Sequence, residues 1–432
     1  MPCVPIWLLS TSSAASAFAR RSIPRRCSAR WAFPMCSDAV VKRILALSSI
    51  RSDYDLMSTL YKRLTADPGM DFKLLVSGAH LSPSHGYSAR HVLEDGVPLL
   101  SKVETLISGD TRSARLKTAS NLLSASIDLV KDFSPDAMLI AGDREDVLVG
   151  AMIGGFLGIP TVHFFGGDHA ADGHIDNPVR HATSKLASLH FVSHEEHRQR
   201  LLSLGEESSR IHVTGSLALD KFMDEPMLDR AEVASRVGAP SQAFAASWAV
   251  LIFHPIAEEE AVAADYIETA CRILLERGYH VFLGAPNTDP GNHRLVDALA
   301  RLDLDPRVTF YKNIPRNLFV NLLRHSALIT GNSSAGLLEA PSLKMPTINL
   351  GKRQRGRLAA SSVLFTDGSA QAFVSALDRV EQPEFQRGLA HLANPYGDGR
   401  STDRVMSLLR TIDFQAFLRK AADPLAICHE PR

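Results

Sequence analysis

From Lys42 onward the chain alternates short apolar runs with longer, amphipathic stretches. The run Arg43–Ser49, for example, is followed by Asp55–Thr65, which has the length and pattern of an amphipathic helix. Strands of a parallel sheet are buried on both faces, so each one is a short continuous apolar run in the sequence. The alternation therefore predicts βαβ units and an α/β fold built on parallel sheets.

The strand candidates form two series, separated by the less hydrophobic, helix-prone segment Lys221–Ala239. A chain of 432 residues is too long for one ordinary core, because a typical domain has about 100–200 residues. We expect two Rossmann-like, doubly wound domains, at 41–222 and 245–395. Residues 396–420, with the helix candidate Thr402–Leu409, are expected to pack back on the first domain. The strand candidates are Arg43–Ser49, Phe72–Ser77, Ala137–Ala141, Thr161–Phe164, Leu189–Val192, Ile211–Thr214, Val250–His254, Val281–Gly284, Val308–Tyr311, Ala327–Thr330 and Thr347–Leu350.

The opening segment has a different composition from the rest of the chain. Met1–Cys36 is rich in Arg, Ser and Ala and contains no acidic residue, which is typical of an organelle transit peptide. The alternative is a start codon assigned too early, with Met35 as the true first residue. We favour this alternative because the first strand begins a few residues after Met35. In either case we expect residues 1–40 to be a disordered leader without a role in the chemistry.

Composition excludes several classes of function. Lys plus Arg and Asp plus Glu number 47 each, so the chain has no electrostatic reason to bind nucleic acid. The five cysteines show neither a C-x-x-C pair nor spacing typical of disulfides or zinc. No apolar stretch reaches the roughly 20 residues that a membrane span requires. We therefore expect a cytoplasmic protein that binds neither nucleic acid nor membrane.

Charged residues directly follow the strand candidate Ala137–Ala141. The segment Gly142–Asp146 places Asp143 and Arg144 at the carboxyl end of this strand. Ligands of open α/β sheets bind beyond the carboxyl ends of strands, so this is a position for a functional site. The alternative is that the carboxylates cap the next helix, where an acidic side chain contributes about 1 kcal/mol or less.

The next strand candidate, Thr161–Phe164, leads into two glycines and Asp168, and Asp176 follows. Paired glycines let the backbone approach a ligand closely. Together with Asp143, these carboxylates follow successive strands, a pattern typical of general acid–base catalysis. Three histidines lie in the same stretch: His169, His174 and His181. Each alone is explained as an ordinary polar contact, and their spacing matches no standard metal-ligand pattern, so we predict no metal site.

A second group of candidates lies in the second series of strands. The segment Thr330–Gly336 is rich in small residues and opens the helix that carries Glu339. Free N–H groups and the helix dipole favour an anion there, so we expect a diphosphate, with Glu339 accepting hydrogen bonds from a ribose. Cations follow strand Thr347–Leu350, and Arg51 follows the first strand of the other domain, an arrangement suited to phosphates. These cations are Lys352, Arg353, Arg355 and Arg357, of which Lys352 and Arg355 are better explained as part of a solvated loop.

Ten short blocks occur in a recognisable order. They are Arg51–Tyr54, Gly78–Pro83, Gly142–Arg144, Gly166–Asp168, Ile175–Asp176, Arg180–His181 with Lys185, Phe253–Pro255, Pro286–Asp289, Gly331–Ser334 with Glu339, and Arg353–Arg357. In this order the chain resembles the hydrolysing UDP-N-acetylglucosamine 2-epimerases. The resemblance extends from Lys42 to about Leu409, and so many blocks at strand ends are more specific than any one of them.

The resemblance implies a GT-B architecture, in which two Rossmann-like domains face a cleft. It also implies a reaction that needs no cofactor: UDP leaves C1 while the C2 proton is removed, and water adds to the resulting glycal. The products would be N-acetylmannosamine, for sialic-acid-type sugar biosynthesis, and UDP. No carbonyl acidifies the sugar C2–H, so departure of UDP must lead and build positive charge on the ring, which carboxylates stabilise.

The resemblance also assigns residues by position. Asp143, Asp168 and Asp176 match the catalytic carboxylates, with Asp143 taking the C2 proton, and Arg180 and His254 complete the catalytic set. The substrate-binding set is Arg51, His80, Arg144, Asn287, Asn332, Ser333, Ser334, Gly336, Glu339, Arg353 and Arg357. A nucleotide sugar is the implied partner, and a homodimer or homotetramer the implied assembly.

This chain departs from the family pattern at three positions. Asp168 stands where the family usually has Glu, Asn177 where it has an acidic residue, and His85 where relatives are aromatic or apolar. These departures point to a slower reaction or to another hexosamine substituent. Four alternatives stay open: UDP-N,N′-diacetylbacillosamine as the substrate, a non-hydrolysing epimerase, a GT-B glycosyltransferase, and an inactive protein that binds nucleotide sugars.

Overall fold

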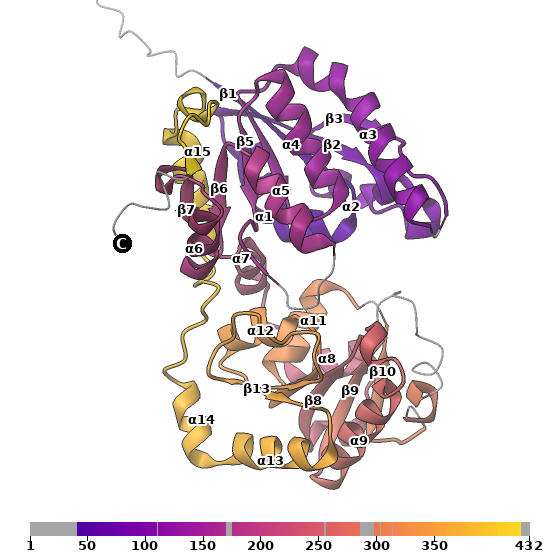
Figure 1. Cartoon of the computed structure of the whole chain (residues 1–432). Coiled ribbons are helices and arrows are strands. Elements are labelled where there is room, and N and C mark those ends of the chain that lie inside the picture. Colours follow the sequence, from indigo (N-terminus) through magenta and orange to yellow (C-terminus); the bar gives the residue numbers. More distant parts are fainter. Residues whose placement is uncertain are drawn as a thin grey trace, which may run out of the picture. The chain divides into compact units, whose positions relative to one another are not determined.

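A computed structural model describes residues 41–109, 111–169, 175–254, 256–285, 298–302, 304–312 and 314–424 of the chain. The expected leader, 1–40, lies outside the described residues. Two parallel sheets with helices on their faces make up the fold (Figure 1). The prediction of an α/β fold with two doubly wound sheets is therefore confirmed. The domain boundaries given above stay predictions.

The first sheet has seven strands in the order β3-β2-β1-β4-β5-β6-β7, all parallel. The order reverses at β1, which places the ends of β1 and β4 side by side where ligands of such sheets bind. The strands are β1 Lys42–Ser48, β2 Met70–Ser77, β3 Leu99–Val103, β4 Ala137–Ala141, β5 Thr161–Phe164, β6 Leu189–Val192 and β7 Ile211–Val213. The helices are α1 Arg51–Ala66, α2 Ala89–Glu94, α3 Arg112–Phe133, α4 Glu145–Leu157, α5 Asp176–Leu186, α6 Glu195–Ser203 and α7 Leu217–Asp224.

The second sheet has six parallel strands in the order β10-β9-β8-β11-β12-β13. The strands are β8 Ser247–Ile252, β9 Tyr279–Gly284, β10 Val308–Tyr311, β11 Leu328–Gly331, β12 Thr347–Leu350 and β13 Val363–Thr366. The helices that follow α7 in the chain are α8 Arg230–Val237, α9 Ala263–Glu276, α11 Arg316–Arg324, α12 Ala335–Leu338, α13 Ala370–Glu381, α14 Pro383–Leu389 and α15 Ser401–Thr411.

Both faces of each sheet are buried. Leu45 and Leu47 of β1 belong to one apolar cluster, while Ile44 and Ala46 belong to another on the opposite face. Side chains of a strand alternate between faces, so covering both faces with helices requires a continuous apolar run. This is the pattern from which the strands were predicted, and β4, β5, β6, β10 and β12 agree with it residue for residue.

Two strands were missed from the sequence, and several predicted strand ends differ from the structure by one to three residues. The missed strands, β3 and β13, are the outermost strands of their sheets and carry exposed residues such as Lys102 and Phe365. Strands at a sheet edge are covered less completely, so their apolar pattern is weaker. The strand predicted at Val250–His254 instead spans Ser247–Ile252, which leaves His254 in the loop beyond β8.

The last helix, α15, packs against α1 and α7 of the first series (Figure 1). Val405, Met406 and Leu409 join the apolar cluster of β1 and α1. Lys42 at the start of β1 donates hydrogen bonds to three carbonyls at the end of α15, those of Leu409, Arg410 and Ile412, at 2.8–3.0 Å. Cations at a helix C-terminus stabilise its free carbonyl groups. These contacts hold the end of the chain on the first sheet.

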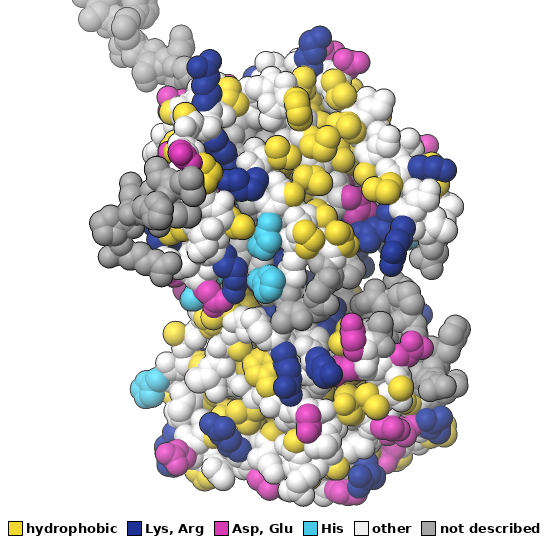
Figure 2. Space-filling view, viewed as in Figure 1, with side chains coloured by type: hydrophobic (Ala, Val, Ile, Leu, Met, Phe, Trp, Pro, Cys, Tyr) yellow, Lys and Arg dark blue, Asp and Glu magenta, His cyan; other side chains and the backbone are white. Residues whose placement is uncertain are grey.

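The surface over α3 and α4 gathers hydrophobic side chains (Figure 2). Phe156 of α4 is 85% exposed and Leu116 of α3 is 70% exposed.

No helix within the described residues has the length and apolar character to cross a membrane.

Candidate active site

A cavity of about 170 Å³ lies at the carboxyl ends of the first sheet. Asp143 reaches it from the end of β4, and Asp168 from the end of β5. The charged and polar side chains that line it are Asp53, Asp143, Asp168, Arg180, Ser193, His197, Ser216, Arg357 and Tyr396. Four residues predicted from the sequence, Asp143, Asp168, Arg180 and Arg357, are thus brought together.

Arg180, a residue of α5, pairs with Asp143. One terminal nitrogen of the guanidinium donates to the Asp143 carboxylate, and the other donates to the carbonyl of Asp168 at 3.0 Å and to Oδ1 of Asn177 at 3.3 Å. The Arg180 side chain is only 10% exposed. Hydrogen bonds between ionised groups are about twice as strong as neutral ones, so this pairing fixes the orientation of Asp143.

Arg357 holds the second carboxylate. It follows β12 in the chain, and its Nη2 donates to Asp168 Oδ2 at 2.8 Å. Burial alone would raise the pKa of Asp168, but Arg357, His197 and Arg180 outweigh burial and lower this pKa to about 2. Burial lowers the pKa of His197, whose Nε2 lies 3.5 Å from Asp168 Oδ1, to about 4. Asp168 is therefore ionised and His197 neutral at neutral pH.

Asp53, in the first turn of α1, has the opposite electrostatic environment. Burial raises its pKa well above the usual value for a carboxyl, and the nearby acids Asp146 and Asp143 act in the same direction. The positive charge of Arg144 lowers the pKa of Asp53 but offsets these effects only in part. The Nε of Arg144 also lies 3.7 Å from Asp146 Oδ1. The cavity therefore combines two carboxylates held by arginines with a third acid, Asp53, whose raised pKa favours its protonated form.

Asp176, His169 and His181 do not line the cavity. Asp176 is the first residue of α5, one helical turn before Arg180. The rings of His169 and His181 stack with centroids 6.3 Å apart, whereas His174 lies outside the described residues. Among the described residues, no group of three or more His, Cys, Asp and Glu side chains is arranged to hold a metal ion.

Asn332 organises the predicted nucleotide region of the second sheet. It is fully buried, its Oδ1 accepts from the backbone N–H of His254, and its Nδ2 donates to the carbonyl of His254, both at 2.7 Å. Arg353 and Gln354 donate to the Asn332 carbonyl at 3.2 and 2.9 Å. The preceding Gly331 has φ +113°, and a Cβ there would lie 1.9 Å from the carbonyl oxygen of Ile252. Asn332 thus joins the loops after β8, β11 and β12.

The predicted diphosphate helix is shorter than the sequence suggested. α12 is a single turn, Ala335–Leu338, and Glu339 follows it rather than lying within it. Glu339 is buried and pairs with Arg316 at 3.3 Å, and burial raises its pKa. Ser333 and Ser334 precede this turn, with Ser333 Oγ accepting from the N–H of Ala335 at 3.3 Å. A Cβ at Gly336 would lie 2.5 Å from Thr347 Cγ2, so this glycine allows close packing on β12.

Other predicted binding residues lie away from the cavity. His80 is fully buried, its ring nitrogens lie 2.9 and 2.8 Å from the hydroxyls of Ser48 and Ser88, and burial lowers its pKa to about 4. This environment makes His80 an internal support of its loop. Arg51, at the start of α1, is exposed and pairs with Asp55 at 3.4 Å. Arg144 lines a neighbouring cavity of about 110 Å³, and Asn287 lies outside the described residues.

Five of the charged and polar residues that line the cavity were missed from the sequence: Asp53, Ser193, His197, Ser216 and Tyr396. Asp53 lies inside the quoted block Arg51–Tyr54, but an acid in the first turn of a helix is ordinarily explained as a capping residue. Tyr396 follows the turn that begins at Asn394, and His197 lies in α6 among several charged residues. For Asp53, His197 and Tyr396, only the tertiary structure shows that the side chain lines the cavity.

The chain is similar to known 2-epimerases over most of its length. The family model for UDP-N-acetylglucosamine 2-epimerase matches residues 62–410. A UDP-N,N′-diacetylbacillosamine 2-epimerase (hydrolyzing) from Legionella pneumophila is 28% identical over 86% of this chain and 97% of its own length. A UDP-N-acetylglucosamine 2-epimerase from Neisseria meningitidis serogroup B is 28% identical over 78% of this chain and 87% of its own length.

A solved structure supports the same fold. The crystal structure of a UDP-GlcNAc 2-epimerase from Neisseria meningitidis bound to UDP-GlcNAc superposes with a TM-score of 0.73. It is 19% identical in sequence, and the match covers 85% of this chain and 99% of the other. The predicted GT-B architecture is therefore confirmed. Because the family model matches most of this chain, the chain belongs to the UDP-N-acetylglucosamine 2-epimerase family.

Proposed function

We propose that the protein is a hydrolysing 2-epimerase, which converts UDP-N-acetylglucosamine and water to free N-acetylmannosamine and UDP. The observation that carries the proposal is that Asp143 and Asp168 line one cavity, each paired with a different arginine, Arg180 and Arg357. Carboxylates stabilise positive charge on a sugar ring, and guanidinium groups stabilise a departing diphosphate.

The first step is elimination of UDP. The C1–O bond breaks, its electron pair leaves with the diphosphate, and Asp143 takes the C2 proton as the C1–C2 double bond forms. Ionised Asp168, close to the ring, stabilises the positive charge that builds at C1. Arg357 lies beside Asp168 and would stabilise the diphosphate as its negative charge develops.

The second step is addition of water to the glycal. C2 needs a proton, and C1 then accepts the oxygen of water. Asp53 lines the same cavity and its raised pKa favours the protonated form, so we assign it as the acid that protonates C2. The proton lost by the water restores Asp53, and Asp143 releases its proton to solvent with UDP. Atoms and charges then balance over the cycle.

A second candidate substrate is UDP-N,N′-diacetylbacillosamine. The specific observation in its favour is the likeness to the Legionella pneumophila protein, which this chain matches over 97% of that protein's length. The bonds broken and formed at C1 and C2 would be the same, so the carboxylates keep their roles with either substrate.

The test is an NMR assay of both nucleotide sugars in D₂O without metal or acceptor, with Asp143→Asn as the inactive control. We expect free 2-epimer, free UDP and deuterium at C2 from one substrate. An epimerised nucleotide sugar would instead indicate a non-hydrolysing epimerase. UDP release that requires an added acceptor would indicate a glycosyltransferase, and binding without turnover an inactive sugar-binding protein. The expected homodimer or homotetramer stays a prediction, which light scattering of the purified protein would check.

A further inference from the structure

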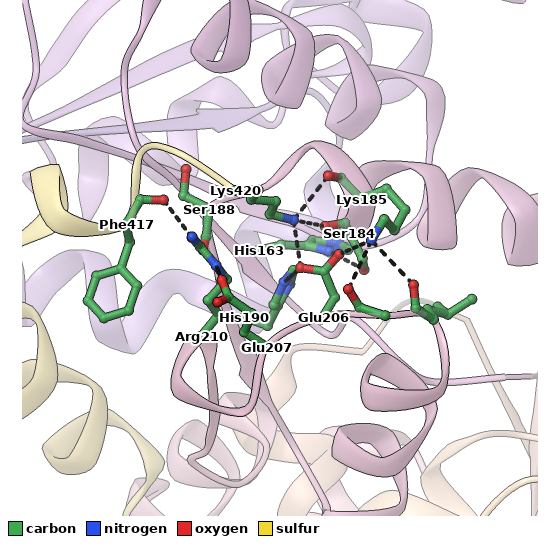
Figure 3. Close-up of polar contacts among 12 residues, drawn as sticks. His163, Ser184, Lys185, Ser188, His190, Glu206, Glu207, Arg210, Phe417 and Lys420 are labelled. Atoms are coloured by element: carbon green, nitrogen blue, oxygen red, sulfur yellow. Dashed lines mark hydrogen bonds and ion pairs between the residues drawn. The ribbon is translucent and has the colours of Figure 1, made fainter. Parts of the chain in front are cut away.

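His163 is a fully buried histidine in β5 that does not line the cavity. Its Nε2 lies 2.9 Å from the carbonyl oxygen of Gly142, at the end of β4. Its Nδ1 lies 3.0 Å from the hydroxyl of Ser184, in α5. Figure 3 labels both His163 and Ser184, whose side chains lie close together. One ring therefore joins three elements of the first sheet.

The two contacts determine which ring nitrogen carries the hydrogen. A carbonyl oxygen only accepts, so Nε2 must be protonated and donate to Gly142. Burial lowers the pKa of His163 to about 3, so the ring is neutral and Nδ1 accepts from the Ser184 hydroxyl. A single tautomer thus satisfies both nitrogens, and rotation of the ring would break both hydrogen bonds.

The partners of His163 are neighbours of the catalytic pair. Gly142 immediately precedes Asp143, and Ser184 lies four residues, or about one helical turn, beyond Arg180 on α5. We propose that His163 is a positioning residue, which sets the distance between the β4 end that carries Asp143 and the helix that carries Arg180. This inference rests on the proposed function, because it assigns His163 a role in the geometry of that reaction.

The neighbouring strand supplies a matched control. His190 of β6 lies opposite His163 in the sheet register and is equally buried. Its Nε2 lies 2.9 Å from Glu206, which also pairs with Lys420 at 2.6 Å and Lys185 at 2.7 Å (Figure 3). This cluster holds the end of the chain, and none of its members lines the cavity. Substitution of His190 therefore perturbs a buried histidine without touching Gly142.

The experiment compares His163→Phe with His190→Phe in steady-state kinetics and thermal unfolding. We expect both variants to lose stability, but only His163→Phe to lower kcat, by about 10- to 100-fold, with KM changed less than about 3-fold. His163→Gln, whose amide can still donate to Gly142, should recover part of kcat. Ser184→Ala, which keeps the Gly142 hydrogen bond, should lower kcat by a smaller factor. These two variants keep the test valid if His163→Phe does not fold.

Equal kcat in His163→Phe and His190→Phe would overturn the inference. A kcat of His163→Gln no higher than that of His163→Phe would overturn it as well. Hydrogen exchange separates this failure from failure of the proposed function. If the wild type releases no UDP from either nucleotide sugar, the proposed function fails. The positioning role then stands only if His163→Phe speeds amide exchange in both 141–146 and α5 more than His190→Phe does.

Discussion

Arg357 and Asp168 pair at 2.8 Å although they lie 189 residues apart in the chain. Arg357 follows β12 of the second sheet and Asp168 follows β5 of the first. In this pair the carboxylate neutralises a cation that the proposed reaction needs for the leaving diphosphate. Substrate must draw part of this hydrogen bonding away from Asp168, which would leave the carboxylate available to the sugar ring.

Replacing Arg357 tests this exchange. We expect Arg357→Ala to lower kcat/KM by about 10²- to 10³-fold, because a donor that would stabilise the departing diphosphate is lost. Arg357→Lys should recover only part of the loss, since an ammonium cannot bind two oxygens in the manner of a guanidinium. Arg355→Ala is the control, because Arg355 is exposed and points to the carbonyl of Thr366 at 3.3 Å. Equal losses in the Arg355 and Arg357 variants would contradict the assignment.

Asp53→Asn should increase stability while it removes activity. A raised folded-state pKa means that the native state binds the proton more tightly than the unfolded chain, so stability falls as pH rises above the unfolded value of 3.8. Asn cannot ionise, so we expect Tm at pH 7.5 to increase by about 1–3 °C. We also expect kcat to fall, because C2 loses its proton donor.

Differential scanning calorimetry between pH 5 and 8 would check the stability effect, with Asp55→Asn as the control on the same helix. A lower Tm for Asp53→Asn at pH 7.5 would show that Asp53 is ionised in the native state and would refute its role as an acid.

Glu206 should make the protein sensitive to acid. Although burial opposes ionisation, His190, Lys420 and Lys185 lower the pKa of Glu206 to about 2. A depressed carboxyl pKa stabilises the fold above the unfolded value of 4.5, and this stability is lost as pH falls from there to about 2. We expect Glu206→Gln to lower the free energy of unfolding at pH 7 by about 2–3 kcal/mol and to flatten its pH dependence below 4.5.

Urea unfolding at a series of pH values measures this effect. Glu207→Gln is the adjacent control: its carboxylate pairs with Arg210 at 2.5 Å but is 34% exposed. A Glu207 variant that loses as much stability as the Glu206 variant would argue against a special role for the buried cluster.

The sequence predicted the fold well because the two features that determine it are local. Continuous apolar runs mark strands covered on both faces, and ligands bind beyond the carboxyl ends of such strands. This reasoning located Asp143 and Asp168 without structural information. It could not locate Asp53 or His163, because the first resembles a helix-capping acid and the second lies inside an apolar strand.

The same limit explains why some residues predicted to bind the substrate do not line the cavity. His80 and Glu339 belong to sequence blocks of the family, but their side chains are buried against Ser48, Ser88 and Arg316. A sequence block shows that a residue type belongs at a position, whereas ligand contact and internal support depend on which way the side chain points. Only tertiary structure distinguishes the two.

Asn332→Asp tests the junction of loops in the second sheet. The substituted oxygen would face the carbonyl of His254 in place of a donating amide, so a buried donor becomes a repelling acceptor. We expect a loss of about 1–3 kcal/mol in unfolding free energy and weaker binding of UDP, because the loops carrying His254 and Arg353 separate. Asn321→Asp is the matched control, since Asn321 is equally buried and donates to the carbonyls of Pro226 and Asn317. We expect the two variants to lose similar amounts of stability. Calorimetric titration with UDP should show weaker binding only for Asn332→Asp. Unchanged UDP affinity in that variant would place the nucleotide elsewhere.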